Sequence, residues 1–528
     1  MTESTFKLTY ATMFNPPEEL HRRYEDTLRN KKAQLGKNYG MIINGKERYS
    51  AEVFENRNPA NTDEVLGVFQ KGTRQDVEDA VQSAKTAQIK WKRIPWQERV
   101  AIIRKAADNI DKRIYELAVA LSLEVGKNRM EALGDAAESA DLMRYACDQM
   151  EANDGFIHRM GKDPLAGYDA TNISMMLPYG VWLVISPFNF PCALTGGPAG
   201  AALVTGNSVI IKPASDTPWA PRIYVECLLE AGVPEGVVNY ITGSGSEVGQ
   251  TLVEHPFIDG ITFTGSYDVG MRIYRSFSQW IYIRPVIMEL GGKNAAIVSK
   301  NADLETAAIG IMRSAFGLQG QKCSACSRVF IEEEVYDDLV NLLVTLAEKI
   351  TVGDPTRREI YMGPVINRNS YQDYQNYIDD LRKSGRILTG AKVFTEGDYA
   401  KGFFCAPTFV ADLPLTHPLW QQEMFLPITT IAKVDSLDQA MTYTNQVKYG
   451  LTGGFYGTEE EAAWFFDNIE AGVVYANRPQ GATTGAWPGF QPFGGWKASG
   501  ATGKQAGGLN YLQQYMREQS RTLIRRIS

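Results

Sequence analysis

The chain has 528 residues and a mass of 58.6 kDa, which is enough for about three domains of ordinary size. Its 44% hydrophobic and 22% charged residues exclude a wholly disordered chain, a collagen and a small disulfide-stapled domain. With 54 basic and 61 acidic residues the net charge is −7, which gives no support to nucleic-acid binding. We therefore expect a small-molecule ligand and no nucleic-acid partner.

The cysteines and histidines indicate a reduced protein without a metal centre. The six cysteines are dispersed, unlike a secreted disulfide framework, so we expect free thiols and a cytoplasmic location. They are Cys147, Cys192, Cys227, Cys323, Cys326 and Cys405. The four histidines are too scattered to predict a zinc site. They are His21, His158, His255 and His417.

No targeting or membrane segment is expected. The N-terminus has no basic stretch followed by an apolar core, and the acidic Glu3 disfavours a transit peptide. Residues 170–211 carry no charge and are long enough to span a bilayer, but they contain several helix breakers. These include Pro178, Pro187, Pro191 and Pro198. We interpret this stretch as a buried strand, a loop and a short helix.

In chain order, short strands are predicted over residues 40–70, followed by a helical region over 74–150. Within that region, apolar residues at three- and four-residue spacing predict helices over 76–87, 97–123 and about 129–150. Residues 156–177 have mixed polarity with several glycines and indicate an excursion such as a hairpin.

Strands and helices alternate after residue 180, which favours a parallel, doubly wound sheet. The predicted strands are 180–185, 208–211, 237–241 and 260–263, with helices over 218–231 and 246–255. A second α/β unit follows, with strands at 295–298 and 328–331 and helices at 303–316 and 334–350. The tail is predicted to be helical over 510–516, with a basic end that could be an interaction arm.

Three residues could carry chemistry. Cys323 follows a glycine- and glutamine-rich loop and precedes a strand, where the neighbouring Lys322 could favour the thiolate; an inert structural thiol is the alternative. Glu289 precedes two glycines in an apolar run, where burial would raise its pKa toward that of a useful base; a capping or salt-bridged Glu is the alternative. Asn189 ends a strand and could donate to an oxyanion, or could be a turn residue. The spacing of Cys323 and Cys326 is weak evidence for a redox or zinc motif.

Several strand ends carry residues compatible with a nucleotide, because open α/β sheets bind ligands at that edge. Lys212 and Ser215 could hydrogen-bond ribose hydroxyls, and Gly265 and Ser266 open a helix whose N-terminus suits an anion. The segment 243–249 reads Gly-x-Gly-x-x-x-Gly, one residue longer than the usual dinucleotide fingerprint.

Together these motifs resemble those of the aldehyde dehydrogenase superfamily, over a match from about Ile42 to Leu512. The 34-residue separation of Glu289 and Cys323 also fits that family. The matching stretches are Glu289-Leu290-Gly291-Gly292-Lys293, Gly320-Gln321-Lys322-Cys323, Pro187-Phe188-Asn189-Phe190-Pro191, Phe263-Thr264-Gly265-Ser266, Glu423-Met424-Phe425-Leu426-Pro427 and Pro492-Phe493-Gly494-Gly495. Within the superfamily, residues 320–328, 484–495 and the long N-terminal extension are most similar to the branch that oxidises glutamate semialdehyde.

The resemblance implies an α/β fold with a Rossmann-type cofactor domain, an α/β catalytic domain and a small oligomerisation element. The implied boundaries are 1–155 and 177–287 for the NAD(P)-binding domain, 288–485 for the catalytic domain, and 156–176 and 500–528 for the oligomerisation element. A homo-oligomer, dimer or higher, is the implied assembly.

The resemblance also implies the site residues. Cys323 would attack the aldehyde, Asn189 would hold the oxyanion and Glu289 would activate the water that hydrolyses the thioester. The cofactor residues implied are Ser186, Pro187, Phe188, Lys212, Ser215, Gly245, Gly249, Gly265, Ser266, Val269, Leu290, Glu423 and Phe425. The substrate residues implied are Ser324, Gly485, Ala486 and Phe493.

The implied function is NAD-dependent oxidation of L-glutamate 5-semialdehyde, formed from 1-pyrroline-5-carboxylate, to L-glutamate in proline catabolism. NADP is a possible second cofactor, because many NAD-specific members carry a phosphate-repelling glutamate where this chain has Ser215. One alternative is another semialdehyde or an aliphatic aldehyde as substrate. A non-catalytic structural descendant is a further alternative, disfavoured by the intact Cys323, Glu289 and Asn189. The length leaves no room for an added proline-oxidising or DNA-binding domain.

Overall fold

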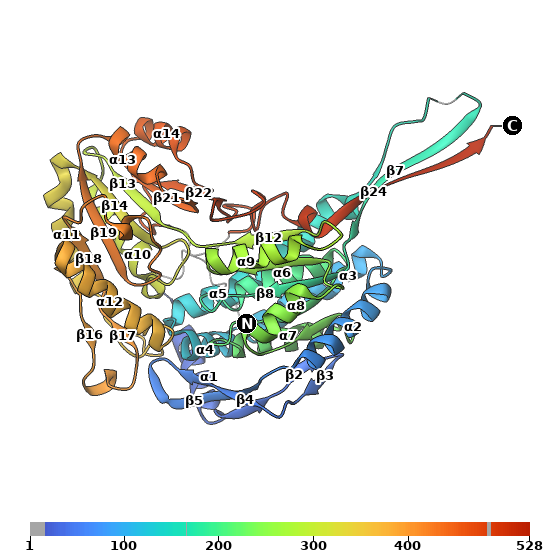
Figure 1. Ribbon diagram of the computed structural model, residues 1–528, viewed down its shortest axis with the longest axis horizontal. Helices are drawn as coiled ribbons and strands as arrows, with labels where there is room; N and C mark the ends of the chain where they lie inside the picture. The colour runs from blue at the N-terminus through green and yellow to red at the C-terminus, as the bar shows by residue number, and fades with distance from the viewer. Residues whose placement is uncertain (1–15, 165, 483–486, 528) are drawn as a thin grey trace.

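Two seven-stranded sheets organise the chain into two lobes, and a β-ribbon projects from the first lobe (Figure 1). The computed structural model describes residues 16–164, 166–482 and 487–527. The first sheet has the strand order β12-β11-β8-β9-β10-β2-β3, and the second has the order β15-β18-β19-β14-β13-β21-β22. The α/β class predicted from the sequence is therefore confirmed.

The first sheet is parallel from β12 to β10, and the hairpin of β2 and β3 joins it antiparallel at β10. Its strands are β2 (Met41–Ile43), β3 (Lys46–Arg48), β8 (Val181–Ile185), β9 (Ser208–Lys212), β10 (Val238–Tyr240), β11 (Gly260–Thr264) and β12 (Val286–Glu289). The chain runs outward from β8 to β10, then returns to place β11 and β12 on the other side of β8. This reversal is the switch point at which doubly wound sheets form a crevice.

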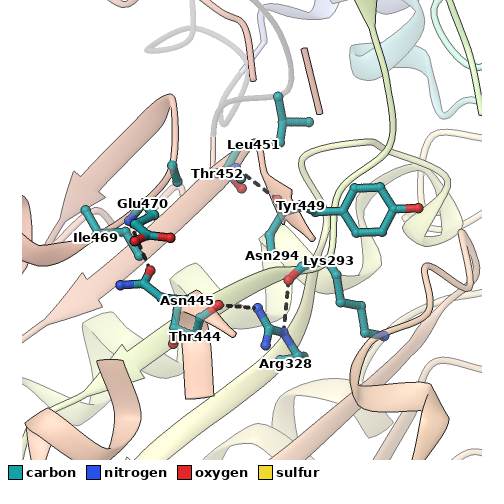
Figure 2. A pocket seen from close by; sticks show the side chains of 12 residues that line it. Lys293, Asn294, Arg328, Thr444, Asn445, Tyr449, Leu451, Thr452, Ile469 and Glu470 are labelled. Carbon is teal, nitrogen blue, oxygen red and sulfur yellow. Dashed lines mark hydrogen bonds between the residues drawn. The ribbon is translucent and has the colours of Figure 1, made fainter. Parts of the chain in front are cut away.

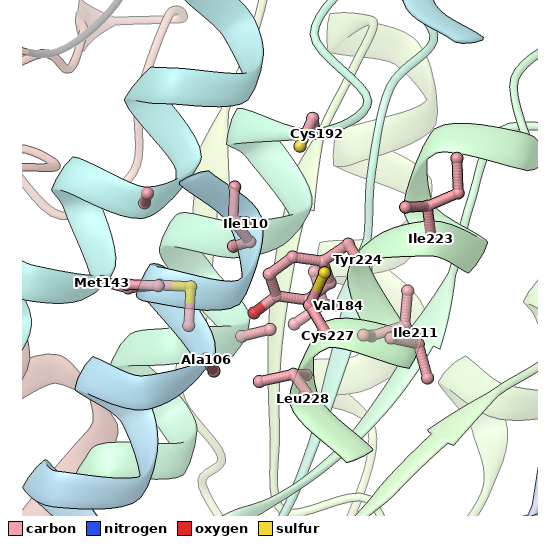
Figure 3. Packing of buried hydrophobic residues seen from close by; sticks show 14 of the residues in the cluster. Ala106, Ile110, Met143, Val184, Cys192, Ile211, Ile223, Tyr224, Cys227 and Leu228 are labelled. Atoms are coloured by element: carbon pink, nitrogen blue, oxygen red, sulfur yellow. The ribbon is translucent and has the colours of Figure 1, made fainter. Parts of the chain in front are cut away.

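Both faces of this sheet are buried, which explains why its strands read as continuous apolar runs. Alternate residues enter different cores: Trp182 and Val184 face one cluster, whereas Val181 and Leu183 face the other. Figure 3 shows the first cluster, where α3, α5 and α7 pack against β8 and β9. The helices of this lobe are α1 (Glu18–Lys32), α2 (Arg74–Trp91), α3 (Trp96–Lys112), α4 (Ile114–Val125), α5 (Arg129–Ala152), α6 (Ala193–Val204), α7 (Trp219–Ala231), α8 (Gln250–Glu254) and α9 (Tyr267–Ser278).

The second sheet is parallel apart from its edge strand β15, and it is also buried on both faces. Its strands are β13 (Asn294–Val298), β14 (Cys326–Glu332), β15 (Arg386–Thr389), β18 (Thr408–Ala411), β19 (Ile428–Val434), β21 (Thr452–Tyr456) and β22 (Val473–Ala476). Its helices are α10 (Leu304–Phe316), α11 (Tyr336–Glu348), α12 (Arg368–Ser384), α13 (Leu437–Asn445) and α14 (Glu459–Asn468).

Smaller elements complete the fold. They comprise a three-stranded sheet of β1 (Lys37–Tyr39), β4 (Val53–Asn58) and β5 (Asn61–Gln70), and the pairs β16 (Val393–Phe394) with β17 (Phe404–Cys405) and β20 (Tyr449–Gly450) with β23 (Trp496–Lys497). Short 3-10 turns cover Asp154–Phe156, Gly317–Gly320, Glu333–Val335, Gly397–Tyr399, Pro418–Trp420 and Leu512–Tyr515.

Local sequence sets several helix boundaries. At the start of α2, the Thr73 hydroxyl accepts from the backbone N–H of Asp76, and the Asp76 carboxylate accepts from the backbone N–H of Thr73. This reciprocal capping box satisfies two backbone donors that the first helical turn leaves unpaired. Its side chains explain why the helix begins two residues before the predicted Asp76.

The helix predicted over 97–123 is wrong as a single element, because the chain breaks at Arg113 into α3 and α4. The Arg113 side chain pairs there with Glu116, Glu226 and Glu230. The two helices also differ in environment, since α3 is amphipathic whereas every residue from Leu117 to Val125 is buried. A change of direction is needed to take α4 into the core.

The prediction for residues 246–255 is correct only in its second half. A π-helical turn covers Gly245–Gly249, and the α-helix α8 follows it. The uncharged stretch 170–211 forms strand β8 and helix α6 as expected, and it also supplies most of a long strand, β7. Among the described residues, no helix has the length and apolar character to cross a membrane.

The tail departs most from the prediction. In place of the helix expected at 510–516, the structure has only a 3-10 turn over Leu512–Tyr515. A long strand, β24 (Met516–Arg526), follows this turn. This strand pairs along its whole length with β7 (Tyr168–Pro178), which also pairs with β6 (Ile157–Arg159). The hairpin expected at 156–177 is thus confirmed, but its main partner was missed. The resulting three-stranded arm extends away from the first lobe (Figure 1).

Candidate active site

The carboxyl ends of the first sheet gather the residues predicted to bind a nucleotide. Residues 186–188 follow β8, Lys212 ends β9, Gly265 and Ser266 follow β11, and Glu289 ends β12. Because β8 and β11 are neighbours at the switch point, these segments border one crevice. The parallel sheet predicted from the sequence therefore brings these residues together at one edge.

Lys212 and Ser215 occupy one part of this edge. The Lys212 side chain is buried, and its ammonium donates to the carbonyl of Pro213 at 2.9 Å. Burial lowers the pKa of this group to about 8. Ser215 is exposed, and its hydroxyl donates to the carbonyl of Gly243 at 3.3 Å. The charge on Lys212 is thus one that an oxygen-rich ligand would stabilise.

The two glycine-containing segments predicted to bind the cofactor, 245–249 and 265–266, are close to Lys212 and Leu290. A side-chain methyl at Gly249 would lie 3.7 Å from Lys212 Cε, whereas one at Gly245 would meet no atom within 4 Å. Ser266 precedes α9, whose N-terminus directs unpaired N–H groups outward. The buried Leu290 packs in the same core as the partly buried Val269 of α9. The Ser186 hydroxyl is buried without a hydrogen-bond partner among the described residues.

Cys323 comes from the second lobe, on the loop between α10 and β14. Before it, Leu318, Gln319 and Gly320 all adopt positive φ, at 49°, 56° and 67°. Positive φ is costly for residues other than glycine and persists only where the surroundings impose it. A side chain at Gly320 would come within 2.3 Å of the Leu426 carbonyl, so the turn is held against the chain that carries Glu423.

The Asn189 loop and the Cys323 loop are joined directly. The Asn189 side-chain amide is buried and donates one N–H to the carbonyl of Gln321 at 3.0 Å. An amide has two N–H donors, and no acceptor for the second is found among the described residues, so it is available to a ligand. Gln321 lies two residues before Cys323 in the sequence, so this contact brings the Asn189 amide close to the thiol.

Cys323 as a residue is partly exposed, unlike the other five cysteines, which are buried, although its sulfur lies in a largely desolvated environment. Burial of the sulfur, followed by the nearby carboxylates of Glu423 and Glu289, raises the pKa of Cys323 to about 12. The backbone N–H groups of Ser324 and Cys323 act in the opposite direction. Lys322 interacts favourably with the Cys323 thiolate, as suggested, because the thiolate raises the pKa of Lys322, but burial and the two carboxylates still raise the pKa of the thiol overall.

Glu289 lies at the end of β12 with one oxygen, Oε2, buried and without a hydrogen-bond partner among the described residues. Burial raises the pKa of this carboxyl to about 8, and the backbone N–H of Gly495 lowers it in part. The prediction that burial would raise the pKa of Glu289 is confirmed. The group can therefore take up and release a proton close to neutral pH.

Glu423 links the two lobes at this point. Its Oε1 accepts from the backbone N–H of Gly292 at 2.8 Å, and burial raises the pKa of the carboxyl to about 7. Phe425, at φ 56°, packs its ring edge-to-face against Phe188, with 5.7 Å between the centroids. Pro187 lies beside Phe188, so residues predicted for one ligand meet from both lobes.

The residues predicted for the substrate are only partly described. Ser324 is buried, and its hydroxyl has no hydrogen-bond partner within the described part of the chain. Phe493 is also buried, in a small apolar cluster against which Cys323 packs. Gly485 and Ala486 lie outside the described residues.

Sequence reasoning missed the residues that hold the Cys323 loop in place. The Asn294 amide donates to the carbonyls of Cys323 at 2.6 Å and Ala325 at 2.9 Å. Arg328 donates to the carbonyls of Lys293, Tyr443 and Thr444 at 2.9–3.1 Å. Both line a small polar pocket beside the site (Figure 2). The position of Asn294, directly after the Glu289–Lys293 motif, is the one signal that could have indicated it.

Lys293 lies in the same region with an ammonium that is buried and has no hydrogen-bond partner among the described residues. Burial, with the charge of Arg328, lowers its pKa to about 7, while Glu423 opposes this. No three His, Cys, Asp or Glu side chains are grouped as metal ligands in the part of the chain that the structure describes.

The model of the aldehyde dehydrogenase family matches residues 46–520, and the chain belongs to that family. Its similar relatives include 1-pyrroline-5-carboxylate dehydrogenase 1 of Halalkalibacterium halodurans, which is 41% identical over 511 residues covering 94% of this chain and 95% of the relative. The 1-pyrroline-5-carboxylate dehydrogenase of Geobacillus thermodenitrificans is 42% identical over 495 residues, 92% of each chain. The family and branch predicted from the sequence are thereby confirmed.

Solved structures agree with this assignment. The 1-pyrroline-5-carboxylate dehydrogenase from Thermus with bound NAD matches over the full length of both chains, with a TM-score of 0.92 at 34% identity. Proline utilization A from Bdellovibrio bacteriovorus matches 96% of this chain with 52% of its own, at 35% identity and a TM-score of 0.90. These matches confirm the predicted aldehyde-dehydrogenase-like fold.

The electrostatics of the thiol can be tested by alkylation of the protein without cofactor. Iodoacetamide should modify Cys323 selectively, at a rate that keeps rising with pH beyond pH ~9, because the thiol has a raised pKa. Glu423→Gln should speed the reaction several-fold at a fixed pH, because it removes the carboxylate with the larger effect. The measurement is mass spectrometry of labelled peptides over time.

The exposed Glu333 provides a matched control for this test, since Glu333→Gln removes one charge far from the thiol. A labelling rate that levels off between pH 7 and 9, or that is the same in Glu423→Gln and the wild type, would contradict the assigned environment.

Proposed function

We propose that the protein is an NAD(P)-dependent 1-pyrroline-5-carboxylate dehydrogenase, which oxidises L-glutamate 5-semialdehyde to L-glutamate in proline catabolism. The observation that carries this proposal is the meeting of Cys323, Asn189 and Glu289 at the switch point of a cofactor-type sheet. The 41–42% identity to dehydrogenases of that name, along nearly the whole chain, supports the choice of substrate.

The crevice residues fit a dinucleotide. The buried Lys212 ammonium has a single carbonyl as its partner, and the Ser186 hydroxyl has none among the described residues. Ribose hydroxyls would supply the missing partners, and the N-terminus of α9 suits a diphosphate. Space above Gly245 is open. Glu423 and the Phe188–Phe425 pair would then hold the nicotinamide half.

The nucleophile in this mechanism is Cys323, which attacks the aldehyde carbon and forms a thiohemiacetal. The free N–H of Asn189 and the backbone N–H of Cys323 stabilise the oxygen on which negative charge develops. A thiol with a pKa of about 12 has little thiolate at neutral pH, so a base must accept its proton as the bond forms. Glu289, whose charge acts on the thiol, is the base available.

The bound cofactor supplies a hydride acceptor, which allows the thiohemiacetal to become a thioester. Glu289 then removes a proton from the water that hydrolyses this thioester and releases the carboxylic acid. Its raised pKa suits both roles, because such a carboxyl can exchange protons near neutral pH.

The substrate carries a carboxylate and an amine at the end away from the aldehyde. By similarity to the family, Ser324 and the loop of Gly485 and Ala486 would receive the carboxylate, and Phe493 would wall the aliphatic chain. The orphaned Ser324 hydroxyl supports the first assignment, and the packing of Phe493 in the Cys323 cluster supports the second.

We also propose the domain division given above, with the arm as an oligomerisation element. Ten of the eleven residues of β24 are exposed, and apolar side chains on the arm include Ile157, Tyr168, Leu523 and Ile524. A narrow ribbon with so little buried surface is marginally stable alone, so another copy of the chain is its expected partner. A reducing cytoplasm suits the protein, because Cys323 must remain a free thiol.

The central test is formation of reduced cofactor with 1-pyrroline-5-carboxylate and a panel of other aldehydes. We expect kcat/KM for 1-pyrroline-5-carboxylate to exceed that for succinate semialdehyde or hexanal by about tenfold or more. Of these three, only the semialdehyde formed from 1-pyrroline-5-carboxylate carries both a carboxylate and an amine. Asn189→Ala should lower kcat by about 10²–10³. Cys323→Ala should abolish oxidation while cofactor binding, measured by calorimetry, is retained.

Glu289→Gln completes the set: it should slow both the burst of reduced cofactor and the hydrolysis of the thioester, because an amide cannot accept the proton of the thiol or of the water. Preference for a different aldehyde would reject the proposed substrate, and turnover by Cys323→Ala would reject the nucleophile.

Cofactor choice gives a second test. We expect steady-state activity with both NAD and NADP, because Ser215 places no negative charge near a ribose phosphate. Ser215→Glu should raise KM for NADP by about tenfold or more through charge repulsion, while activity with NAD persists. Ser215→Gln, which has nearly the same size without the charge, serves as control. No turnover with millimolar NADP in the wild type would contradict this expectation.

Assembly can be tested by sedimentation. The wild type should sediment as an oligomer of the 58.6 kDa chain, and the double variant Leu523→Lys/Ile524→Lys should shift to a smaller species because it charges the apolar side chains of β24. Lys300→Glu, at an exposed site of the second lobe, is the control. A wild-type monomer, or an unchanged double variant, would reject the role of the arm.

A further inference from the structure

A chain of buried hydroxyl groups lies behind the proposed general base. The Trp182 indole N–H is 2.9 Å from Thr262 Oγ1, which is 3.2 Å from the Tyr515 hydroxyl. The Tyr515 hydroxyl is in turn 2.7 Å from that of Tyr511. Tyr515 is fully buried and Tyr511 is 7% exposed, so the chain is shielded from solvent. None of the four residues has a role in the proposed mechanism.

The position of this chain next to Glu289 follows from the sheet. In the parallel pairing of β11 and β12, Thr262 is opposite Ile287 and Thr264 is opposite Glu289. Residues two apart on a strand share a face, so Glu289 projects from the face that carries Ile287 and Thr262. Tyr511 and Tyr515 belong to the core cluster that covers this face together with Ile287. The charge of Glu289 accordingly acts on both tyrosines, and helps to raise the pKa of each.

The hydrogen atoms in this series of hydrogen bonds, from Trp182 to Tyr511, can be assigned one by one. The indole N–H of Trp182 is only a donor, so the Thr262 oxygen accepts from it. In the Thr262–Tyr515 and Tyr515–Tyr511 pairs either hydroxyl can donate, and each of the two consistent arrangements leaves one hydrogen, that of Thr262 or that of Tyr511, without an acceptor in the series. Only the Tyr511 end lies next to an unpaired buried acceptor, so we assign the arrangement in which Thr262 donates to Tyr515 and Tyr515 donates to Tyr511. The Tyr511 hydrogen then has no acceptor within this series of hydrogen bonds. Because a buried donor without an acceptor is costly, this hydrogen needs an acceptor elsewhere.

Glu289 Oε2 is a matching unpaired acceptor, since it is buried and no donor among the described residues reaches it. We propose that Tyr511 is a positioning residue for the general base, and that its hydroxyl donates through one bridging water to Glu289 Oε2. The hydrogen bonds that begin at Trp182 orient that donor, and the water joins two groups between which the structure records no direct hydrogen bond. This inference rests on the proposed function, because it gives Glu289 the role of base.

The predicted effect has a definite sign. The titratable groups that face Glu289 are Cys323 from the loop before β14 and the two tyrosines from the C-terminal segment, while Glu423 faces the same thiol. A donor to the ionised carboxylate favours that form, so losing the donor should raise the pKa at which the base becomes active. Loss of one such hydrogen bond corresponds to a shift of about one pH unit.

The experiment uses p-nitrophenyl acetate, which acylates a thiol without hydride transfer. Release of p-nitrophenol gives a burst for acylation of Cys323 and a linear phase for hydrolysis of the thioester. In Tyr511→Phe the linear phase should have its pH midpoint raised by about one unit, with a rate about tenfold lower below the midpoint and equal to wild type well above it. The burst amplitude should be unchanged. Tyr515→Phe, which breaks the orientation of the chain, should shift the midpoint less and in the same direction.

Tyr224→Phe, a buried tyrosine of α7 outside the chain, should leave the midpoint in place, and thermal melting checks that each variant folds. If Tyr511→Phe does not fold, the Tyr515→Phe midpoint decides the outcome. A pH profile that superimposes on the wild type, or a loss of rate that persists at high pH, overturns the inference. Because the ester needs neither cofactor nor aldehyde, wild-type ester turnover without aldehyde oxidation would reject the proposed function alone.

Discussion

The close contact between two glycine-containing loops holds the active site together. A side chain at Gly292 would come within 2.5 Å of the Cys323 carbonyl, so the segment after β12 can approach the nucleophile only as bare backbone. Asn294 then fixes that carbonyl, and Glu423 fixes the Gly292 N–H. The base and the nucleophile come from different sheets, and this contact sets the distance between them.

Removal of water from this junction determines its chemistry. Burial raises the pKa of the acidic groups Cys323, Glu289 and Glu423, and it lowers the pKa of the basic groups Lys212 and Lys293. Each charge therefore depends on a partner that is close by, whether a carboxylate, a backbone N–H or a bound ligand. A site of this kind changes its protonation when a charged molecule enters, which suits a reaction with two proton transfers.

The sequence predicts what depends on local pattern. The parallel strands β8 to β11 and β13 and β14, and the residues Cys323 and Glu289, could be predicted because each lies in a short, characteristic stretch. The break at Arg113 could not, since it depends on glutamates about 115 residues away in α7. Strand β24 was missed because its partner is more than 300 residues earlier and its exposed faces show no alternation. Asn294 was missed because its importance lies in the carbonyls it meets, which only the fold reveals.

The segment 511–526 has a consequence for how the first lobe folds. Tyr511 and Tyr515 cover one face of the first sheet, and β24 begins directly after them and pairs with β7. The first lobe thus takes part of its core from residues that follow the whole second lobe in the sequence. Contacts between such distant segments form slowly, because the loop between them must first be closed. The wall behind the base is therefore expected to form late in folding, after both sheets, so the first lobe cannot complete its core independently of the second.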